Sequence, residues 1–368
     1  MHAFLVLACL TAVLAADPPI FEENFDYFDL SVWQHELTAG GGGNWEFQYY
    51  TNNRTNSYTR DGILYIKPTL TSEKYSEAFL TSGRLELWGS SPSDLCTGNA
   101  DWGCDRTGNA MNILNPIQSA RLRTVHSFNF KYGRIEVRAK MPSGDWLWPA
   151  IWLLPTRNSY GGWPASGEID IIESRGNEHL EDYLGNSVGS NSVGTDHMTA
   201  TMHWGPYYPH NAWQKTYASR HATTGTYASQ FHTYAVEWTS KNIRFLLDGE
   251  EILFVDPGDN GFWEYGDFNT NLPFADNPWR EGTKMAPFDE EFYIILNVAV
   301  GGTLGYFGDD MQNYPLNCPK PWSNNSPHAP KEFWDARDCW YPTWRPDEEN
   351  GELAAMQVDY VRVWDLTE

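Results

Sequence analysis

The sequence predicts an all-β protein, a single sandwich of sheets joined by long loops. Short alternating or continuous apolar runs recur from end to end, and convincing amphipathic helices are lacking. Aromatic residues are also abundant, with 18 Trp and 20 Tyr in 368 residues, and aromatic side chains favour strands because they pack well on a pleated surface. No repeat, charge block or low-complexity linker divides the chain, so we expect one domain over residues 16–368.

Four runs are the clearest strands. Residues 134–140 alternate polar and apolar, as in a strand with one buried face. Residues 243–254 form a hairpin pattern that turns at Asp-Gly. Residues 292–300 are almost continuously apolar, as in a strand covered on both faces, and residues 356–364 are a final alternating strand.

The segments between these runs are rich in Gly, Pro, Asn, Asp and Trp. Irregular segments this long usually carry function or line a site. They cover residues 90–116, 175–196, 256–290 and 303–350.

The N-terminus is a short apolar run, Phe4 to Ala15, that ends in small residues. This run predicts a signal peptide over residues 1–15 and secretion, into a digestive tract or another extracellular space. A buried N-terminal strand is the alternative. No later run reaches the roughly 18 apolar residues of a membrane helix. In a secreted chain, the Asn-x-Ser/Thr triplets at Asn53 and Asn324 are predicted glycosylation sites.

Four cysteines follow the predicted signal peptide, and an even number in a secreted chain predicts two disulfides. Three pairings are open. We favour the two that close local loops, and a zinc site is disfavoured because no pair has metal-binding spacing or a neighbouring His. The favoured pairs are Cys96 with Cys104 and Cys318 with Cys339.

The net charge of −23 excludes partners that need basic patches. We therefore expect no nucleic-acid or membrane partner, and anionic polysaccharides are disfavoured less firmly, since a local basic cleft can exist in an acidic protein. The many aromatic rings suit the apolar faces of neutral sugars, although a large β core also collects aromatics.

The most informative segment is Gly-Glu-Ile-Asp-Ile-Ile-Glu, residues 167–173. Strand alternation places Glu168 and Asp170 on one face but turns Glu173 toward the core, where a lone carboxylate is costly. We predict a β-bulge near Ile171 and Ile172, which returns Glu173 to the shared face. An acidic strand facing water is the alternative, but indoles cluster in the preceding sequence, which favours a ligand.

With its flanks, Trp163 to Asn177, this segment resembles the signature of glycoside hydrolase family 16. The resemblance is closest to animal laminarinases (endo-β-1,3-glucanases) and to the related β-1,3-glucan recognition proteins. It extends over nearly the whole chain and includes residues 44–51, 148–152, 202–205, 297–302 and 320–344. It implies a β-jelly-roll of two antiparallel sheets with a concave cleft and a retaining mechanism.

By motif position, the resemblance implies that Glu168 is the nucleophile and Glu173 the general acid/base. Retaining enzymes hold two such carboxyls about 5–5.5 Å apart. We assign Asp170 to orienting Glu168. The resemblance implies no required cofactor. Relatives sometimes bind a structural calcium, but no dense Asp/Asn loop names its ligands. We expect a monomer.

Six further residues are candidates for binding the sugar. The indoles would stack on sugar rings and the others would hydrogen-bond; each has an ordinary packing or pairing role as its alternative. They are Trp148, Trp152, Trp163, His203, Asn44 and Arg123.

The functional prediction is a secreted retaining endo-β-1,3-glucanase that hydrolyses laminarin-like glucans. The alternative is a non-catalytic β-1,3-glucan recognition protein of innate immunity, and a hydrolase of another galactan is a third, less favoured. We prefer the enzyme because relatives that only bind have typically lost the glutamates, and we expect no separate carbohydrate-binding module before the domain. Leu304 departs from the polar residue expected after Gly-Gly-Thr, which puts some cleft contacts in doubt.

Overall fold

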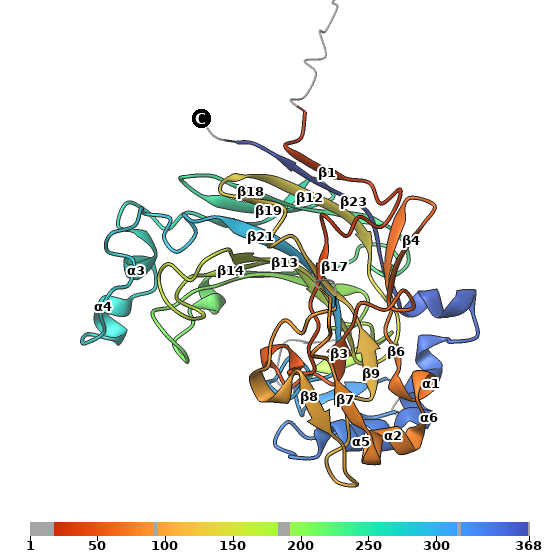
Figure 1. The fold of residues 1–368 in the computed structure, drawn as a ribbon. Coiled ribbons are helices and arrows are strands. Elements are labelled where there is room, and N and C mark those ends of the chain that lie inside the picture. Colours follow the sequence, from red (N-terminus) through yellow and green to blue (C-terminus); the bar gives the residue numbers. More distant parts are fainter. Residues whose placement is uncertain (1–17, 92–93, 183–191, 315–317, 367–368) are drawn as a thin grey trace, which may run out of the picture.

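Two eight-stranded antiparallel sheets form the sandwich in the computed structural model, which describes residues 18–91, 94–182, 192–314 and 318–366 (Figure 1). The first sheet has the order β20-β19-β18-β12-β23-β5-β4, with β1 on β23. Its strands are β1 (Phe21–Glu23), β4 (Ser57–Arg60), β5 (Ile63–Ile66), β12 (Gly133–Lys140), β18 (His232–Trp238), β19 (Ile243–Leu247), β20 (Glu250–Val255) and β23 (Met356–Trp364).

The second sheet carries the acidic motif. It has the order β17-β16-β14-β13-β21-β10-β2, with β11 on β21. Its strands are β2 (Gln34–His35), β10 (Arg121–Arg123), β11 (Asn129–Phe130), β13 (Leu147–Pro155), β14 (Glu168–Ser174), β16 (His197–His203), β17 (Tyr217–His221) and β21 (Phe292–Val300).

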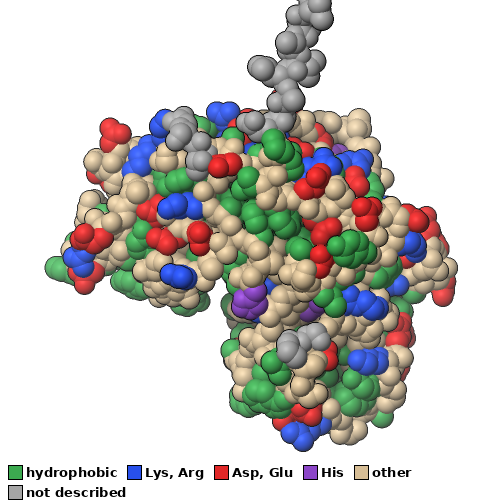
Figure 2. Space-filling model, turned by 45° about the horizontal axis from the view of Figure 1, so that its top comes forward, with side chains coloured by type: hydrophobic (Ala, Val, Ile, Leu, Met, Phe, Trp, Pro, Cys, Tyr) green, Lys and Arg blue, Asp and Glu red, His purple; other side chains and the backbone are tan. Residues whose placement is uncertain are grey.

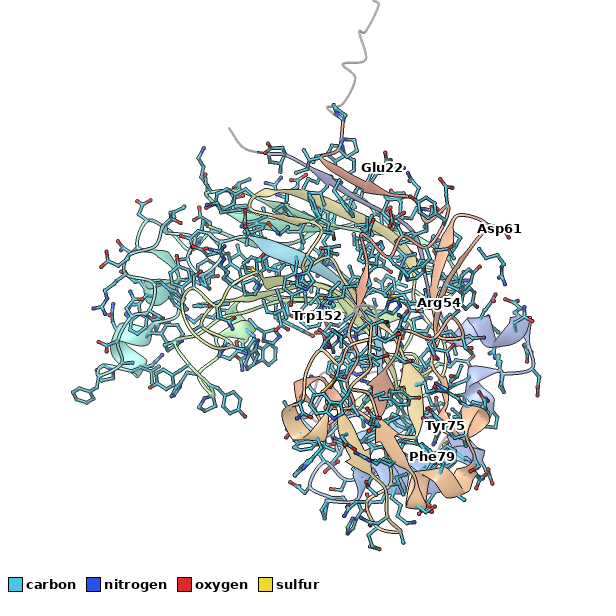
Figure 3. The ribbon with its side chains drawn as sticks, viewed as in Figure 1. Glu22, Arg54, Asp61, Tyr75, Phe79 and Trp152 are labelled. Atoms are coloured by element: carbon cyan, nitrogen blue, oxygen red, sulfur yellow. A yellow bond between two sulfur atoms is a disulfide. The ribbon has the colours of Figure 1, made fainter. Side chains whose placement is uncertain are left out.

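A lobe projects from the sandwich beside the second sheet (Figure 1). Figure 2 shows the molecule hollowed where the lobe and the sandwich meet. The lobe contains β3 (Gln48–Tyr50), β6 (Thr69–Leu70), β7 (Arg84–Glu86), β8 (Asp105–Thr107), β9 (Ile117–Ser119) and the helices α1 (Thr71–Lys74), α2 (Glu77–Ser82), α5 (Ala329–Asp335) and α6 (Arg337–Trp340). Figure 3 labels Tyr75 and Phe79 in the lobe.

The remaining elements are short and lie in the connections. Within the described residues, the segments expected to be irregular contain α5, α6 and two further short α-helices, which their Gly- and Trp-rich composition concealed. The connections hold β15 (Leu180–Asp182), paired with β22 (Met311–Asn313), the helices α3 (Gly261–Tyr265) and α4 (Phe268–Asn271), and the 3-10 turns Gly41–Gly43, Ala100–Trp102, Trp213–Lys215, Tyr341–Trp344 and Glu349–Ala354.

The strand predictions are confirmed. Strand β12 alternates buried and half-buried residues along its length, whereas every residue of β21 is buried. The hairpin of β19 and β20 turns at Asp248 and Gly249, whose φ angles of 50° and 85° suit the tight turn that joins antiparallel strands. Ring packing of Trp238 against Phe130 and Phe292 joins the two sheets inside the core.

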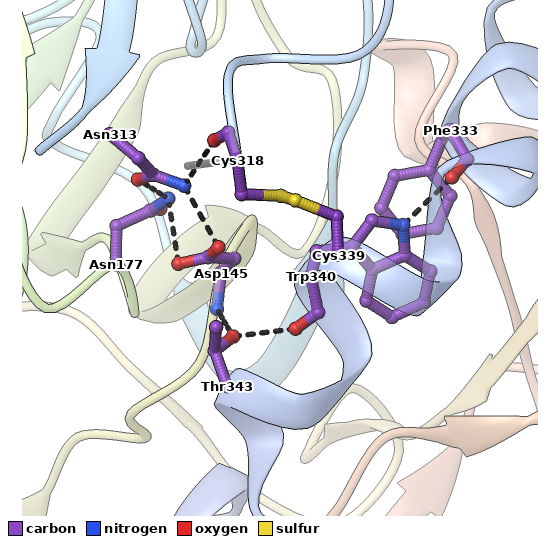
Figure 4. The surroundings of a disulfide bond; sticks show 8 residues. All are labelled: Asp145, Asn177, Asn313, Cys318, Phe333, Cys339, Trp340 and Thr343. Atoms are coloured by element: carbon purple, nitrogen blue, oxygen red, sulfur yellow. Dashed lines mark hydrogen bonds between the residues drawn. A yellow bond between two sulfur atoms is a disulfide. The ribbon is translucent and has the colours of Figure 1, made fainter. Parts of the chain in front are cut away.

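Both favoured disulfides are present. Cys96 pairs with Cys104, and Cys318 pairs with Cys339. Figure 4 shows the second beside a buried network, in which Asn313 donates hydrogen bonds to Asp145 (2.8 Å) and to the Cys318 carbonyl (3.0 Å).

The two predicted glycosylation sites differ in their surroundings. Asn53 lies in a turn and accepts a hydrogen bond from the Thr55 amide at 3.0 Å. Asn324 uses both ends of its amide, donating to the Phe307 carbonyl (2.9 Å) and accepting from Lys320 (3.0 Å). Modification at either site stays a prediction. The predicted signal peptide lies outside the described residues, and none of the described helices is long and apolar enough to cross a membrane.

Candidate functional site

The predicted β-bulge is present in β14. On the side of β13, Ile172 faces Ile151 while Asp170 faces the next residue, Trp152, so Ile171 is the extra residue. On the side of β16, the step from Asp170 to Glu173 spans three residues of β14 but two of its partner. The bulge resets the alternation and brings Glu173 to the face that carries Glu168 and Asp170.

His203, at the end of β16, completes the acidic group. It pairs across the sheet with Glu168, and its Nε2 lies 3.2 Å from Asp170 Oδ2. The Asn211 side chain accepts hydrogen bonds from the backbone amides of Trp204 and Trp213, so its Nδ2 faces His203 Nδ1 at 2.8 Å. This orientation favours a hydrogen on Nε2, on the side of the ring that forms the ion pair with the buried Asp170.

Two indoles donate hydrogen bonds to the outer acids. Trp163 Nε1 donates to Glu168 Oε2 at 2.7 Å, and Trp148 Nε1 donates to Glu173 Oε1 at 2.9 Å. The Trp148 ring also stacks on Tyr306, with centroids 3.8 Å apart and planes 4° from parallel. One face of Trp148 is therefore covered within the protein, whereas Trp163 remains 43% exposed.

Burial sets the electrostatics of this group. It raises the pKa of Asp170 well above the usual range, with the Glu168 charge adding to the effect, and it raises the pKa of Glu173. Burial lowers the pKa of His203, but the facing carboxylates, Asp170 first, outweigh it and raise that pKa to about 9. The site thus combines carboxyls with weakened acidity and a histidine that tends to hold its proton.

A row of paired side chains extends the site across the sheet. It consists of Trp152, Asn297, Tyr50 and Arg121. Trp152 Nε1 donates to Asn297 Oδ1 at 2.7 Å, and Asn297 Nδ2 donates to the Tyr50 hydroxyl at 3.2 Å. The guanidinium of Arg121 lies over both the Tyr50 and Trp152 rings, with centroid distances of 4.6 and 5.2 Å. Figure 3 labels Trp152 near the angle between the sandwich and the lobe.

Asn44 and Arg123 lie at the periphery of this row. The Asn44 amide donates to Glu46 at 3.2 Å. Arg123 donates to Gln34 at 2.9 Å and to Glu36 at 3.2 Å, so it already has the ordinary acidic partner that its alternative role required. The structure therefore brings the acids, His203 and the three indoles together, whereas Asn44 and Arg123 are paired with other residues.

Glu168, Asp170 and His203 could together approach a cation, since their ligand atoms lie within 4.8 Å of one another. A histidine with a raised pKa is a poor metal ligand near neutral pH, because metal binding must displace its proton. The donor set therefore fits a proton-sharing group better than a metal centre. The expectations about cofactors and calcium stay predictions.

Sequence reasoning missed several residues of the face. Asn297 is a polar residue within the apolar run of β21, and Arg121 is a buried cation in a short strand; both patterns are expensive unless the side chains are paired. The cost of burying such side chains without partners could have marked both residues as members of the site. Tyr306, which supports Trp148, lies in a loop and left no such signal.

Comparison with known proteins identifies relatives of this chain. The family model described as glycosyl hydrolases family 16 matches residues 97–269. A β-1,3-glucan-binding protein from Penaeus monodon is 55% identical over 349 residues, covering 94% of this chain and 90% of the relative. The β-1,3-glucan-binding protein 1 of Galleria mellonella is 34% identical over 94% of this chain, which spans 64% of that relative's length.

Solved structures share the fold. The laminarinase from Rhodothermus marinus matches with a TM-score of 0.55 and 25% identity, over 95% of this chain and 98% of that one. The laminarinase catalytic domain from Thermotoga maritima matches with a TM-score of 0.54 at 23% identity, over 95% of this chain and 98% of that chain. The prediction of a β-jelly-roll of two antiparallel sheets is confirmed.

The prediction of a retaining endo-β-1,3-glucanase is contradicted. Relatives that match over nearly the whole chain are named as glucan-binding proteins. The prediction gave decisive weight to the retained Glu168, Asp170 and Glu173. The presence of these carboxylates does not distinguish a glucanase from a glucan-binding protein, because the oxygens that serve hydrolysis equally accept hydrogen bonds from sugar hydroxyls. Specific catalytic roles for these three residues stay a prediction.

Proposed function

Because the chain belongs to glycosyl hydrolase family 16, with a β-1,3-glucan-binding protein as a relative over nearly its whole length, we propose that it binds β-1,3-glucan as a recognition protein and does not cleave it. The observation that carries the proposal is the 55% identity over 94% of the chain to the Penaeus monodon protein. Secretion is part of the proposal, and the two disulfides suit an oxidising compartment.

The face of the second sheet has the groups that a neutral sugar chain requires. Exposed Trp163 offers a flat ring for the apolar face of a glucose unit, and the acids beside it accept hydrogen bonds from hydroxyls. Glu168 and Glu173 are already held in place by indole N–H groups. Such preorganised side chains lose little freedom on binding, which favours affinity.

The same contacts are compatible with binding without turnover. Hydrolysis requires one carboxylate to attack the sugar while another donates a proton to the leaving oxygen. In this site each indole donates to one oxygen of Glu168 or Glu173, and the acceptor capacity that remains on each carboxyl suits a sugar hydroxyl. We assign these acids to hydroxyl recognition.

The experiment is a sedimentation assay on insoluble β-1,3-glucan, with cellulose as the control polysaccharide, followed by calorimetric titration with soluble laminarin. We expect retention on the β-1,3-glucan, release by laminarin and no retention on cellulose. Equal retention on both solids would show that binding is not specific for the linkage, and no retention on either would overturn the proposal.

A further inference from the structure

A cavity of about 820 Å³ lies in the lobe, apart from the acidic group. This volume falls in the range of small-molecule sites, roughly 300–1,000 Å³. None of Glu168, Asp170 and Glu173 lines it. The segments around it are residues 39–46, 102–115, Thr303 and 326–331.

Two tryptophans on the cavity wall are presented to solvent. Trp45 is 49% exposed and Trp102 is 70% exposed. Both have left-handed backbone conformations, with φ angles of 53° and 59°, which residues with a side chain seldom adopt. Exposed indoles held in costly conformations indicate a function for the rings themselves.

The loop that carries Trp102 is braced. The Cys96–Cys104 disulfide closes it, and the Asn99 side chain accepts a hydrogen bond from the Cys104 amide at 3.1 Å. A ring on a braced loop is a preorganised contact, because little freedom remains to be lost when a ligand arrives.

Glu46 connects the cavity to the sheet face. It lines the cavity, and its carboxylate accepts hydrogen bonds from Gln48 at 2.6 Å and from the Tyr50 hydroxyl at 3.2 Å. Tyr50 in turn accepts from Asn297, which binds Trp152. The groups that link Glu46 to Trp152 are buried, so they fix the position of the cavity wall relative to the sheet face.

The chemistry of the wall favours a neutral ligand with apolar faces. The Arg106 and Lys331 side chains on this wall already have partners within the protein. Arg106 donates to Asn115 at 2.8 Å and to the Asp101 carbonyl at 2.6 Å, and Lys331 forms an ion pair with Asp335. An anion would have to displace these contacts. Indole rings beside carboxylate and amide oxygens instead suit the alternating apolar faces and hydroxyls of a sugar.

We propose that this cavity is a second contact region for β-1,3-glucan, which takes a segment of a chain whose other part lies on the sheet face. The inference rests on the proposed function and extends it. Two linked contact regions on one polymer strengthen binding beyond either alone, because engagement of the second becomes intramolecular. Long glucans should therefore bind more tightly than short oligosaccharides.

The test is calorimetric titration with laminarin of the Trp45→Asn/Trp102→Asn double variant. Asparagine tolerates left-handed backbone, so the substitutions remove the rings without adding strain. We expect the Kd for laminarin to rise about tenfold or more, the usual loss when anchoring tryptophans are truncated. Phe274→Asn, which removes a fully exposed ring elsewhere, should leave the Kd within about twofold.

Three outcomes would overturn one or both proposals, and the first of them separates the two. If the double variant binds laminarin like the wild type while Trp163→Ala binds it poorly, the second region is wrong and the proposed function stands. If the wild type does not bind laminarin, both fail. Tighter binding of sulfated laminarin that depends on Trp45 and Trp102 would overturn the neutral ligand.

A measurement on the unmodified protein covers the case in which the double variant misfolds. Hydrogen exchange with and without laminarin should show new protection in residues 98–115 as well as in residues 168–174. Protection confined to residues 168–174 would overturn the inference.

Discussion

Replacing His203 by Asn tests the electrostatics at the centre of the site. The Asn side chain keeps an acceptor for Asn211 but is too short to reach Asp170, whose carboxyl is buried. A folded pKa of about 9, against 6.5 for an unperturbed histidine, corresponds to about 3 kcal/mol for the interaction of the charged ring with its surroundings. We expect the variant to be up to about 3 kcal/mol less stable than the wild type below pH 6.5.

The pH dependence follows from the sign of the His203 shift. A raised pKa contributes stability that is fully present below pH 6.5 and is lost as the pH rises through about 9. Urea unfolding of wild type and His203→Asn at several pH values between 6 and 10 should therefore show a difference that shrinks at high pH. The exposed His126→Asn is the control and should show no difference. In an Asp170→Asn background the effect of His203→Asn should largely vanish, because the two residues act as a pair. Equal stabilities of the wild type and His203→Asn at pH 6 would refute this reasoning. A difference between them that does not change with pH would also refute it.

Three further outcomes are expected. Trp163→Phe removes the hydrogen bond to Glu168 but keeps a ring, so the Kd for laminarin should rise about fivefold in a calorimetric titration; an unchanged Kd would contradict this contact. Burial raises the pKa of Asp145 from 3.8 to about 7, so the free energy of unfolding of the wild type should fall by up to about 4 kcal/mol as the pH rises from 4 to 7. Urea unfolding of Asp145→Asn should show a weaker dependence of stability on pH. The same dependence in the variant and the wild type would contradict this prediction. Replacing Cys318 and Cys339 by Ser opens a loop with a sequence separation of 21 and should cost about 3 kcal/mol in the same assay; a loss below about 1 kcal/mol would show that the loop closure contributes little.

The sheets were predictable because their strands satisfy local rules. The continuous apolar run of β21 indicates a strand buried on both faces, and the alternation of β12 indicates a strand buried on one face. The bulge in β14 was predictable for an energetic reason, since strict alternation would have buried Glu173 among isoleucines. The disulfides followed from loop closure.

Other features depend on contacts between distant segments, which no local pattern records. The stacking of Tyr306 on Trp148 joins a loop to β13 across more than a hundred residues of sequence. The cavity in the lobe is lined by four segments that are separate in the sequence, so only the folded arrangement creates it. The functional prediction failed for a different reason: the same carboxylates serve cleavage and recognition, and their presence in a motif does not distinguish the two.

The most direct test of recognition without cleavage is to bind laminarin to saturation and then measure new reducing ends over a long incubation. We predict saturable binding with laminarin recovered at its original length. Steady release of reducing ends by the wild type, abolished by Glu168→Gln, would contradict it.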